Sequence, residues 1–500
     1  MLPSADDKNQ IDFSELHLWN MNSRESHGGF HMPGHVSGRF FSDEFCRRLV
    51  ATDTTELMET DDLHAPSGPV GEALSYIAEV YHAKASFFVT SGSSVGVHVM
   101  LASVMNKQSF LLLPRTVHLS VVHILQILDC KYAFIELPDA FETGLPFAQI
   151  TEEALREALD SFPQTTDVLI TSPDYYGQCA DLERICELAH SRGCSVLVDE
   201  AHGAHFPFSD SCPKNAMQSG ADISVTSLHK TIPALTMASL IHVSETAIQT
   251  GRVSSNRIFD MLCQFETSSP SFLIAASSEY AVSYMAQFGK AMIAEKIDEI
   301  DNFRSELRKY PSVCKMKDRQ NSLRDPLRIV LDFSDSKCMT AFSFFLAMNE
   351  KGIPGEFCDV SRVILIVSIW NQRGDFDNLL KVIRECAETK KALPEKCFIH
   401  MNAVDRRFGR AISSAREAVI MTRDAVYGGL QTEDVPVCEA VNRICAQEII
   451  PYPPGIPLLW PGEMITKVDV DLLTDLRAFH IGIRGMHNDK VKVFCNYGNK

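Results

Sequence analysis

A single lysine lies among apolar and hydroxyl side chains in the stretch ISVTSLHKTIPALTMASLIHV, residues 223–243. Apart from two histidines, Lys230 is the one residue of that stretch whose side chain can carry a charge. Burial lowers the pKa of a lysine amine, and the neutral amine is a nucleophile that attacks carbonyl carbon. The simpler alternative is a lysine at the start of a helix whose amine extends to water. The stretch alone is compatible with both interpretations.

Two other segments would meet Lys230 if the chain forms a parallel sheet. TSGSSVG (90–96) follows an apolar strand and opens a helix, so its backbone N–H groups and the hydroxyls of Ser93 and Ser94 would face an anion. Asp199 ends an apolar strand, at the sheet edge where ligands bind, and Lys230 follows the next strand. A phosphate cradle, a carboxylate for a protonated ring nitrogen and a lysine in apolar surroundings together predict a pyridoxal phosphate site.

The phosphate cradle also fits a serine hydrolase. GSSVG (92–96) matches the nucleophile-elbow pattern G-x-S-x-G with Ser94 at its centre. HGG (27–29) lies upstream like an oxyanion loop, and Asp199 and His202 follow in a workable order. The elbow normally comes after several sheet strands, whereas one clear strand precedes it here. The hydrolase is therefore the weaker alternative.

The segment DEAHGAH (199–205) raises the question of a metal site. His202 and His205 are three residues apart, and Asp199 and Glu200 are adjacent. A strand end and a loop do not turn these side chains to one side as a helix would, and a further ligand is not evident. We therefore expect no metal site.

Short apolar runs alternate with amphipathic ones between about residues 85 and 245. This alternation predicts a mostly parallel sheet with helices on both faces. The expected strands are 86–90, 109–113, 131–136, 167–171, 195–199, 222–226 and 238–243. A helix is expected over 180–193, closed by Gly193, and a long helical stretch near 274–309.

The later part of the chain predicts further domains. Apolar runs at 327–333 and 362–370 suggest a smaller α/β domain. The charged stretch ETKKALPEK (388–396) is typical of a linker, and a helical pattern and the Pro/Gly-dense segment PYPPGIPLLWPGE (451–463) follow it.

Composition limits the classes of protein and partner. Of 500 residues, 45% are hydrophobic and 22% charged, which is ordinary for a globular protein. The net charge of −17 disfavours nucleic acid as a partner and is compatible with a cationic small molecule. We expect neither a membrane span nor a secretory signal, because no apolar run is long enough and the start is polar. The 15 cysteines form no C-x-x-C pair, so we expect reduced thiols and a cytoplasmic location.

Several motifs occur in the order found in a known family. They are FHMPGH (30–35), TELMETDDLHAPSGPV (55–70), FFVTSGSSVG (87–96), VLVDEAHGAHF (196–206), SLHKT (227–231), ETSSPSF (266–272) and YPPGIPLLWPGE (452–463). Together they resemble the pyridoxal-phosphate-dependent ornithine/lysine/arginine decarboxylases, which have the aspartate-aminotransferase fold (fold type I). The resemblance is most specific where the Ser-x-His-Lys and YPPGIP…PGE segments occur together.

The resemblance implies a role for each site residue. Lys230 would bind the cofactor covalently, Asp199 would keep the pyridine nitrogen protonated, and His202 would lie near the reacting carbon. His118 would stack on one face of the ring and Ala201 would pack on the other. The expected phosphate ligands are Ser93, Ser94, Ser227 and His229, with Thr267 or Ser268 reaching the phosphate of a neighbouring subunit.

The same resemblance predicts the domains and the reaction. We expect an N-terminal segment (1–75), a large cofactor domain (76–285), a small α/β domain (286–388) and a C-terminal α+β decarboxylase domain (389–500). The expected reaction removes carbon dioxide from a basic L-amino acid, arginine first and then lysine or ornithine, as in polyamine biosynthesis, in a homodimer or larger oligomer. Glu463 is the residue expected to bind the distal cation of the substrate.

Four positions depart from the pattern of the family, and they bear on the identity of the substrate. Leu119 and Val36 stand where the family often has lysine, Met237 where glutamine is common, and Phe272 where tyrosine is common. An aminotransferase is the nearest alternative, because it would use the same cofactor and lysine, commonly with an arginine that binds the α-carboxylate.

Overall fold

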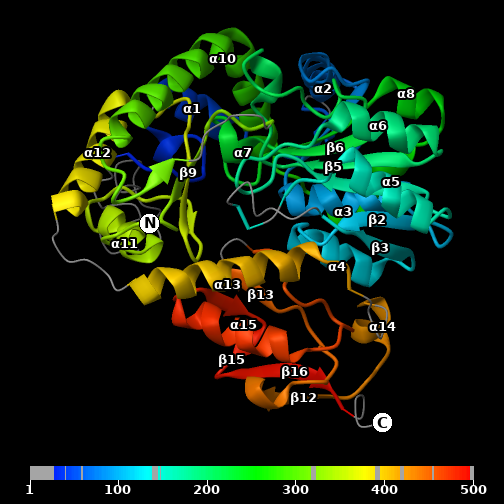
Figure 1. Cartoon of the computed structure of the whole chain (residues 1–500). Helices are drawn as coiled ribbons and strands as arrows, with labels where there is room; N and C mark the ends of the chain where they lie inside the picture. Colours follow the sequence, from blue (N-terminus) through cyan, green and yellow to red (C-terminus); the bar gives the residue numbers. More distant parts are fainter. Residues whose placement is uncertain are drawn as a thin grey trace, which may run out of the picture.

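The protein is described from a computed structural model, shown in Figure 1. The structure describes residues 28–39, 41–57, 60–137, 145–146, 148–316, 323–388, 395–416, 422–452 and 455–495. These residues form a large sheet, a smaller sheet and a C-terminal unit with two short sheets.

The large sheet has seven strands in the order β1-β7-β6-β5-β4-β2-β3 within the described residues. The strands are β1 Ala85–Val89, β2 Phe110–Pro114, β3 Lys131–Ile135, β4 Asp167–Thr171, β5 Ser195–Glu200, β6 Ile223–Ser227 and β7 Ser239–Val243. All neighbours are parallel except for β7, which runs antiparallel to β1 and β6. Each of the seven expected strands is confirmed to within a residue at either end.

Helices cover both faces of this sheet. α3 (Ser93–Val104), α4 (Leu119–Ile127) and α9 (Ser255–Phe265) share one apolar core with β1, β2 and β5–β7. α5 (Glu152–Ser161) and α6 (Leu182–Ser191) share another core with β2–β5. The central strands are buried on both faces, which explains why their sequences are continuous apolar runs and not alternating ones.

The other helices of this part are shorter or peripheral. They are α1 Asp43–Ala51, α2 Pro69–Val80, α7 Leu228–Thr231 and α8 Glu245–Gln249, with 3₁₀ turns η3 Val36–Gly38 and η5 Phe206–Phe208. α7 has only four residues, and it places Lys230 directly after β6.

A 36-residue helix, α10 (Phe272–Leu307), leads to the smaller sheet. That sheet has the order β10-β11-β9-β8 in the part of the chain that is described, and all its pairs are antiparallel. Its elements are β8 Lys315–Met316, β9 Arg328–Asp332, α11 Ala341–Glu350, β10 Phe357–Cys358, β11 Arg362–Ile366 and α12 Arg373–Glu388. α10, α12 and this sheet share one apolar core with α2. This core joins the two sheets.

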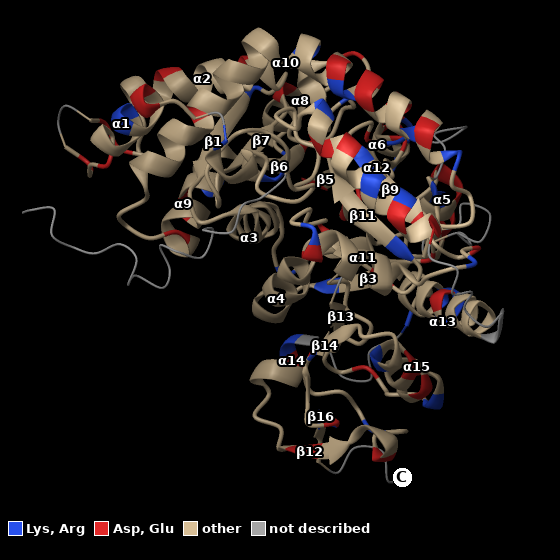
Figure 2. Ribbon diagram, turned by 90° about the vertical axis from the view of Figure 1, so that its left-hand side faces the viewer, with Lys and Arg blue, Asp and Glu red and all other residues tan. Residues whose placement is uncertain are grey.

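The C-terminal unit lies beneath the two sheets in Figures 1 and 2. Its elements are α13 Glu395–Ser413, α14 Thr422–Tyr427, β12 Thr432–Pro436, η6 Val437–Glu439, β13 Ile450–Tyr452, α15 Lys467–Ala478, β14 Gly482–Arg484, β15 Met486–His487 and β16 Lys490–Phe494. α13 and α15 pack over the short sheets. The α/β fold class with three parts is confirmed, while most of the predicted linker (388–396) lies outside the described residues.

Among the described helices, none combines the length and the hydropathy needed to cross a membrane.

Candidate active site

Three neighbouring strands and one helix end meet at a pocket of about 270 Å³. β4, β5 and β6 are adjacent and parallel, so their carboxyl ends lie at one edge of the sheet. Thr171, the last residue of β4, lies opposite Asp199 in β5, and α7 follows β6. The residues that line the pocket are Ser91, Gly92, Ser93, Ser94, Val97, His118, Ser120, Thr171, Tyr175, Asp199, Ala201, His202, His229, Lys230, Thr236 and Met237.

Lys230 turns its amine into this pocket. Its Nζ lies 3.2 Å from Nε2 of His202. Burial lowers the pKa of the amine, and the carboxylates of Asp199 and Glu356 partly oppose that shift. The amine therefore lies in the pocket beside His202, and its reactive role stays a prediction.

Asp199 is buried at the end of β5, with 3% of its surface exposed. Its Oδ1 accepts a hydrogen bond of 3.1 Å from the backbone N–H of Ala201. Burial raises the pKa of the carboxyl group, and Lys230 partly offsets this. A cationic ring nitrogen in the pocket would stabilise the carboxylate further.

The turn between β1 and α3 forms one wall of the pocket. Gly92 precedes the helix with φ of 89°, a conformation that favours glycine. In the first turn of α3, the N–H groups of Val95 and Gly96 donate to the carbonyl of Gly92, while the hydroxyls and N–H groups of Ser93 and Ser94 lie at the wall of the pocket. Glu266 fixes the turn, because its Oε1 accepts a 2.8 Å hydrogen bond from the N–H of Ser91. The arrangement suits a phosphate group.

His118 stands at the N-cap of α4 and lines the pocket. Its Nδ1 accepts a hydrogen bond of 3.1 Å from the N–H of Ser120. Burial, reinforced by the nearby Lys230, lowers its pKa to about 3. The ring is therefore neutral at ordinary pH, with its hydrogen on Nε2.

A second hollow of about 240 Å³ continues from the first. It shares His118, Tyr175, His202 and Lys230 with the first pocket. It adds Met32, Leu119, Arg328, Glu356, Phe357, Ile450, Tyr452, Gly455 and Arg484, so the smaller sheet and the C-terminal unit both contribute to it. The two hollows together offer space for a ring with a phosphate and, beside it, for a second small molecule.

Comparison with known families agrees with this geometry. The signature described as "Orn/Lys/Arg decarboxylase, major domain" matches residues 17–329, and that of the "Orn/Lys/Arg decarboxylase, C-terminal domain" matches residues 407–490. The chain belongs to the Orn/Lys/Arg decarboxylase family. The prediction of an amino acid decarboxylase is thereby confirmed.

Relatives support the assignment to this family, and a solved structure supports the fold. The Bacillus subtilis (strain 168) protein YaaO is 31% identical over 474 residues, which are 94% of each chain. The arginine decarboxylase of the same organism is 31% identical over 455 residues, which are 89% of each chain. The fold resembles that of the Francisella novicida lysine decarboxylase LdcF, with a TM-score of 0.76 and 19% identity over 92% of this chain and 76% of that one.

Most of the site residues expected for this decarboxylase family come together in the pocket. Lys230, Asp199, His118, His202, Ala201, Ser93, Ser94 and His229 all line it. Ser227 is fully buried beneath it, with its hydroxyl 3.3 Å from Nδ1 of His229. Burial lowers the pKa of His229 to about 4, so this ring is also neutral. Thr267 and Ser268 are exposed and do not line this pocket.

The structure places Glu463 outside both hollows, contrary to the prediction that it binds the distal cation of the substrate. Its side chain is 1% exposed, and its carboxylate forms an ion pair with Arg115, which is fully buried. Arg115 Nη2 lies 3.0 Å from Oε2, and the same oxygen accepts a 2.9 Å hydrogen bond from the N–H of Trp460. The carboxylate is therefore committed to fixing the 458–463 segment, and it does not line the pocket.

The serine hydrolase and the metal site would both need a free ring nitrogen of His202. Both ring nitrogens of His202 are engaged, with Lys230 and Arg328, so the ring has no nitrogen to activate Ser94. His205 turns to Asp325 instead, at 2.9 Å. Within the described residues, no group of three or more His, Cys, Asp or Glu is placed to hold a metal ion.

Several residues that line the two hollows were missed by the sequence analysis. Arg328, Glu356, Tyr175 and Arg484 come from separate segments that only the fold brings together. Arg328 begins β9 within the predicted apolar run 327–333, and a charged side chain in that run was the available signal. Glu356, Tyr175 and Arg484 carried no signal of their own.

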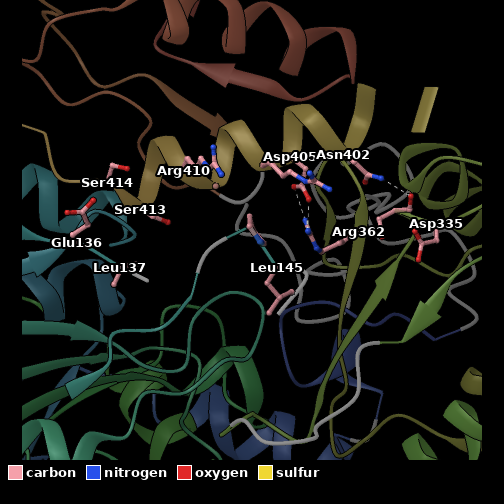
Figure 3. Close-up of a pocket in the computed structure, with 14 residues that line it drawn as sticks. Glu136, Leu137, Leu145, Asp335, Arg362, Asn402, Asp405, Arg410, Ser413 and Ser414 are labelled. Carbon is pink, nitrogen blue, oxygen red and sulfur yellow. Dashed lines mark hydrogen bonds and ion pairs between the residues drawn. The ribbon is translucent and has the colours of Figure 1, made fainter. Parts of the chain in front are cut away.

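A separate hollow of about 520 Å³ lies beside α13 (Figure 3). Arg362 reaches α13 there, with Nη1 2.9 Å from Oδ1 of Asp405 and 3.1 Å from Oδ2 of Asp359. Asn402 of α13 donates to the carbonyl of Ser334 at 3.2 Å. These contacts attach α13 to the smaller sheet, so we assign the hollow to the domain junction and not to catalysis.

Proposed function

We propose that the protein is a pyridoxal-phosphate-dependent decarboxylase of basic L-amino acids, with arginine as the first substrate and lysine or ornithine next. One observation supports this above all: the Lys230 amine, favoured in its neutral form, shares a pocket with the buried Asp199 and the N-terminus of α3. Arginine is placed first because relatives named arginine decarboxylase are 30–31% identical over 89–92% of this chain, whereas relatives named lysine decarboxylase are 22–24% identical.

The residues present fit the proposed cofactor. The hydroxyls and backbone N–H groups of Ser93 and Ser94 would hold its phosphate, and Asp199 would pair with its ring nitrogen. His118 and Ala201 would contact the two faces of its ring. When bound, pyridoxal phosphate supplies an electron sink for the electron pair left behind as carbon dioxide departs.

The chain's own residues have defined tasks in this proposal. Lys230 supplies a neutral amine that attacks carbonyl carbon, which the burial of its side chain favours. Asp199 would hold a proton on the ring nitrogen of the cofactor, because a cation there would offset the burial of the Asp199 carboxylate. His118 stays neutral and so adds no positive charge over the ring.

Glu356 is our proposal for the carboxylate that binds the distal cation of the substrate. It lines the second hollow, and its Oε2 accepts a 2.9 Å hydrogen bond from the N–H of Met32. A guanidinium or ammonium that leaves water needs such a partner. Glu356→Gln should raise the KM for arginine at least tenfold, a loss of about 1.4 kcal/mol, with cofactor affinity within twofold of wild type. Equal KM values for arginine in both proteins would remove Glu356 from recognition.

The proposed assembly is at least a dimer, in which Thr267 or Ser268 reaches the neighbouring site. Both residues are exposed and outside their own pocket. α3 and α4 contain no Lys, Arg, Asp or Glu, so both ribbons lack charged residues in Figure 2, and Ile127 at the end of α4 is 49% exposed. Sedimentation at assay concentration should give a dimer or larger species, and an active monomer would contradict this proposal.

The reaction itself is tested with purified protein, pyridoxal phosphate and each basic amino acid in turn. Carbon dioxide and the corresponding amine are expected, fastest from arginine. A keto acid would indicate an aminotransferase instead. Reduction with borohydride should fix the cofactor on Lys230, and a label on another lysine would overturn the assignment.

A further inference from the structure

His202 stands between two basic side chains in the pocket. Its Nε2 lies 3.2 Å from Nζ of Lys230, and its Nδ1 lies 3.3 Å from Nη2 of Arg328. When they are charged, both neighbours donate hydrogen bonds and accept none. The contacts therefore restrict where the protons of all three side chains lie.

The guanidinium of Arg328 determines which ring nitrogen of His202 accepts a hydrogen bond. It has N–H donors and no acceptor, and it is not deprotonated in proteins, so Nδ1 of His202 must accept. A neutral imidazole that accepts at Nδ1 carries its hydrogen on Nε2. That hydrogen faces Nζ of Lys230, which can accept it only through the lone pair of a neutral amine. If Lys230 were an ammonium, Nε2 of His202 would also have to accept a hydrogen bond. A neutral imidazole has only one acceptor nitrogen, and Nδ1 is already that acceptor.

Arg328 is held firmly in the position that this arrangement needs. It begins β9, pairs in register with Ile366 of β11, and is 7% exposed. Its Nη2 lies 3.7 Å from the carboxylate of Asp325, which His205 and the N–H of Leu327 hold at 2.9 and 2.8 Å.

Gly177 makes room for the arginine. A Cβ at Gly177 would lie 2.6 Å from Cβ of Arg328, and the φ of Gly177 is 79°. A side chain at position 177 would therefore displace Arg328 from His202.

The titratable and charged groups around His202 and Lys230 shift the pKa values of these two side chains. His202 is affected by Lys230, Arg328, His118 and His229, all of which lower its pKa together with burial. Lys230 is affected by Asp199 and Glu356, which raise its pKa, and by burial and Arg328, which lower it. A positively charged His202 is thus disfavoured, and the neutral ring has one tautomer that satisfies both contacts.

We propose that Arg328 is a positioning residue that fixes the Nε2–H tautomer of His202 and thereby holds Lys230 as a neutral amine before the cofactor arrives. The inference rests on the proposed function, in which Lys230 is the residue that binds the cofactor. It assigns to His202 the role of a hydrogen-bond donor to the amine and not of a base.

The tautomer is measured first in the unaltered chain freed of cofactor. Long-range ¹⁵N–¹H spectra of histidine-labelled protein distinguish a protonated from an unprotonated ring nitrogen, and His202→Phe identifies the signal of His202 by its loss. We expect Nε2 to be protonated and Nδ1 to be bare. A hydrogen on Nδ1, or a doubly protonated ring at pH 7, would overturn the inference whether or not the Arg328 variants fold.

The effect on Lys230 is measured by its rate of acylation as a function of pH, read by mass spectrometry on the cofactor-free protein. Arg328→Met should move the midpoint of Lys230 labelling up by at least one pH unit, which makes labelling at pH 7 at least tenfold slower. Arg328→Lys should restore most of the rate, because a lysine donor also forces Nδ1 to accept. Arg484→Met, which removes one positive charge elsewhere in the hollow, should move the midpoint less.

A double-mutant cycle separates the tautomer from simple charge repulsion. If Arg328 acts through His202, then Arg328→Met should move the Lys230 midpoint little in a His202→Phe background. An equal shift in both backgrounds would mean that Arg328 acts through space, and the inference would fail. Borohydride labelling of wild type tests the proposed function separately, because acylation midpoints do not depend on the cofactor.

Discussion

At the scale of single residues, the sequence identified the chemistry better than the specificity. Lys230 and Asp199 could be found because each breaks a rule: a charge beside or within an apolar run needs a reason. Glu463 was expected at the substrate because it closes the Pro/Gly-dense segment 451–463, whereas its observed partner, Arg115, is 348 positions away and no local pattern indicates it. A buried carboxylate paired with a distant arginine and a carboxylate that faces a ligand look alike in sequence.

Asp199→Asn keeps the shape of the side chain and removes its charge. Because burial raises the pKa of Asp199, the ionised carboxylate is less stable in the folded pocket than in the unfolded chain. The free energy of unfolding at pH 7 should therefore not fall, whereas kcat should fall at least 100-fold, about 2.7 kcal/mol of barrier. Denaturant unfolding and steady-state kinetics measure the two effects.

Asp167→Asn is the matched control for that substitution. Asp167 is also buried, and burial also raises its pKa, but it begins β4 at the opposite edge of the sheet. Its replacement should leave kcat within a few-fold of wild type. A near-normal kcat for Asp199→Asn would reduce Asp199 to a structural residue at a strand end.

At the scale of elements, the seven strands of the large sheet were predictable because each is a short apolar run bounded by polar residues. The antiparallel direction of β7 and the position of β1 at the sheet edge were not, since both depend on how the chain crosses between strands. The four-residue helix α7 was also invisible to periodicity, although it carries Lys230. A local sequence pattern therefore predicts the elements but not the path of the chain between them.

The contact between α9 and the β1–α3 turn gives a prediction at this scale. Glu266 follows α9, has 2% of its side chain exposed, and binds the N–H of Ser91 at the phosphate cradle. Glu266→Ala should free the turn and weaken pyridoxal phosphate binding about tenfold or more, since a hydrogen bond to a charged group contributes about 1.5–3 kcal/mol. Glu266→Gln keeps an acceptor and should bind nearly as wild type. Cofactor titration by absorbance measures both, and equal affinity in all three proteins would contradict the role.

At the scale of the whole molecule, the two hollows of the candidate site draw on all three parts of the chain. The large sheet supplies Asp199 and Lys230, the smaller sheet supplies Arg328, and the C-terminal unit supplies Arg484. Arg115 follows β2, stands three residues before His118, and binds both Glu463 and the carbonyl of Leu458 at 3.1 Å. The C-terminal unit is therefore fastened next to the residue expected to stack on the cofactor.

Glu463→Gln tests this attachment against the earlier idea of a substrate carboxylate. The substitution leaves the fully buried charge of Arg115 without a counter-ion, so the free energy of unfolding should fall by about 3–5 kcal/mol, measured by urea denaturation. A double variant, Arg115→Leu with Glu463→Leu, removes both charges and should recover part of that loss. The KM of folded Glu463→Gln for arginine should stay within twofold of wild type, because Glu463 lies outside the pocket. A normal unfolding curve with a KM raised tenfold would instead return Glu463 to the substrate site.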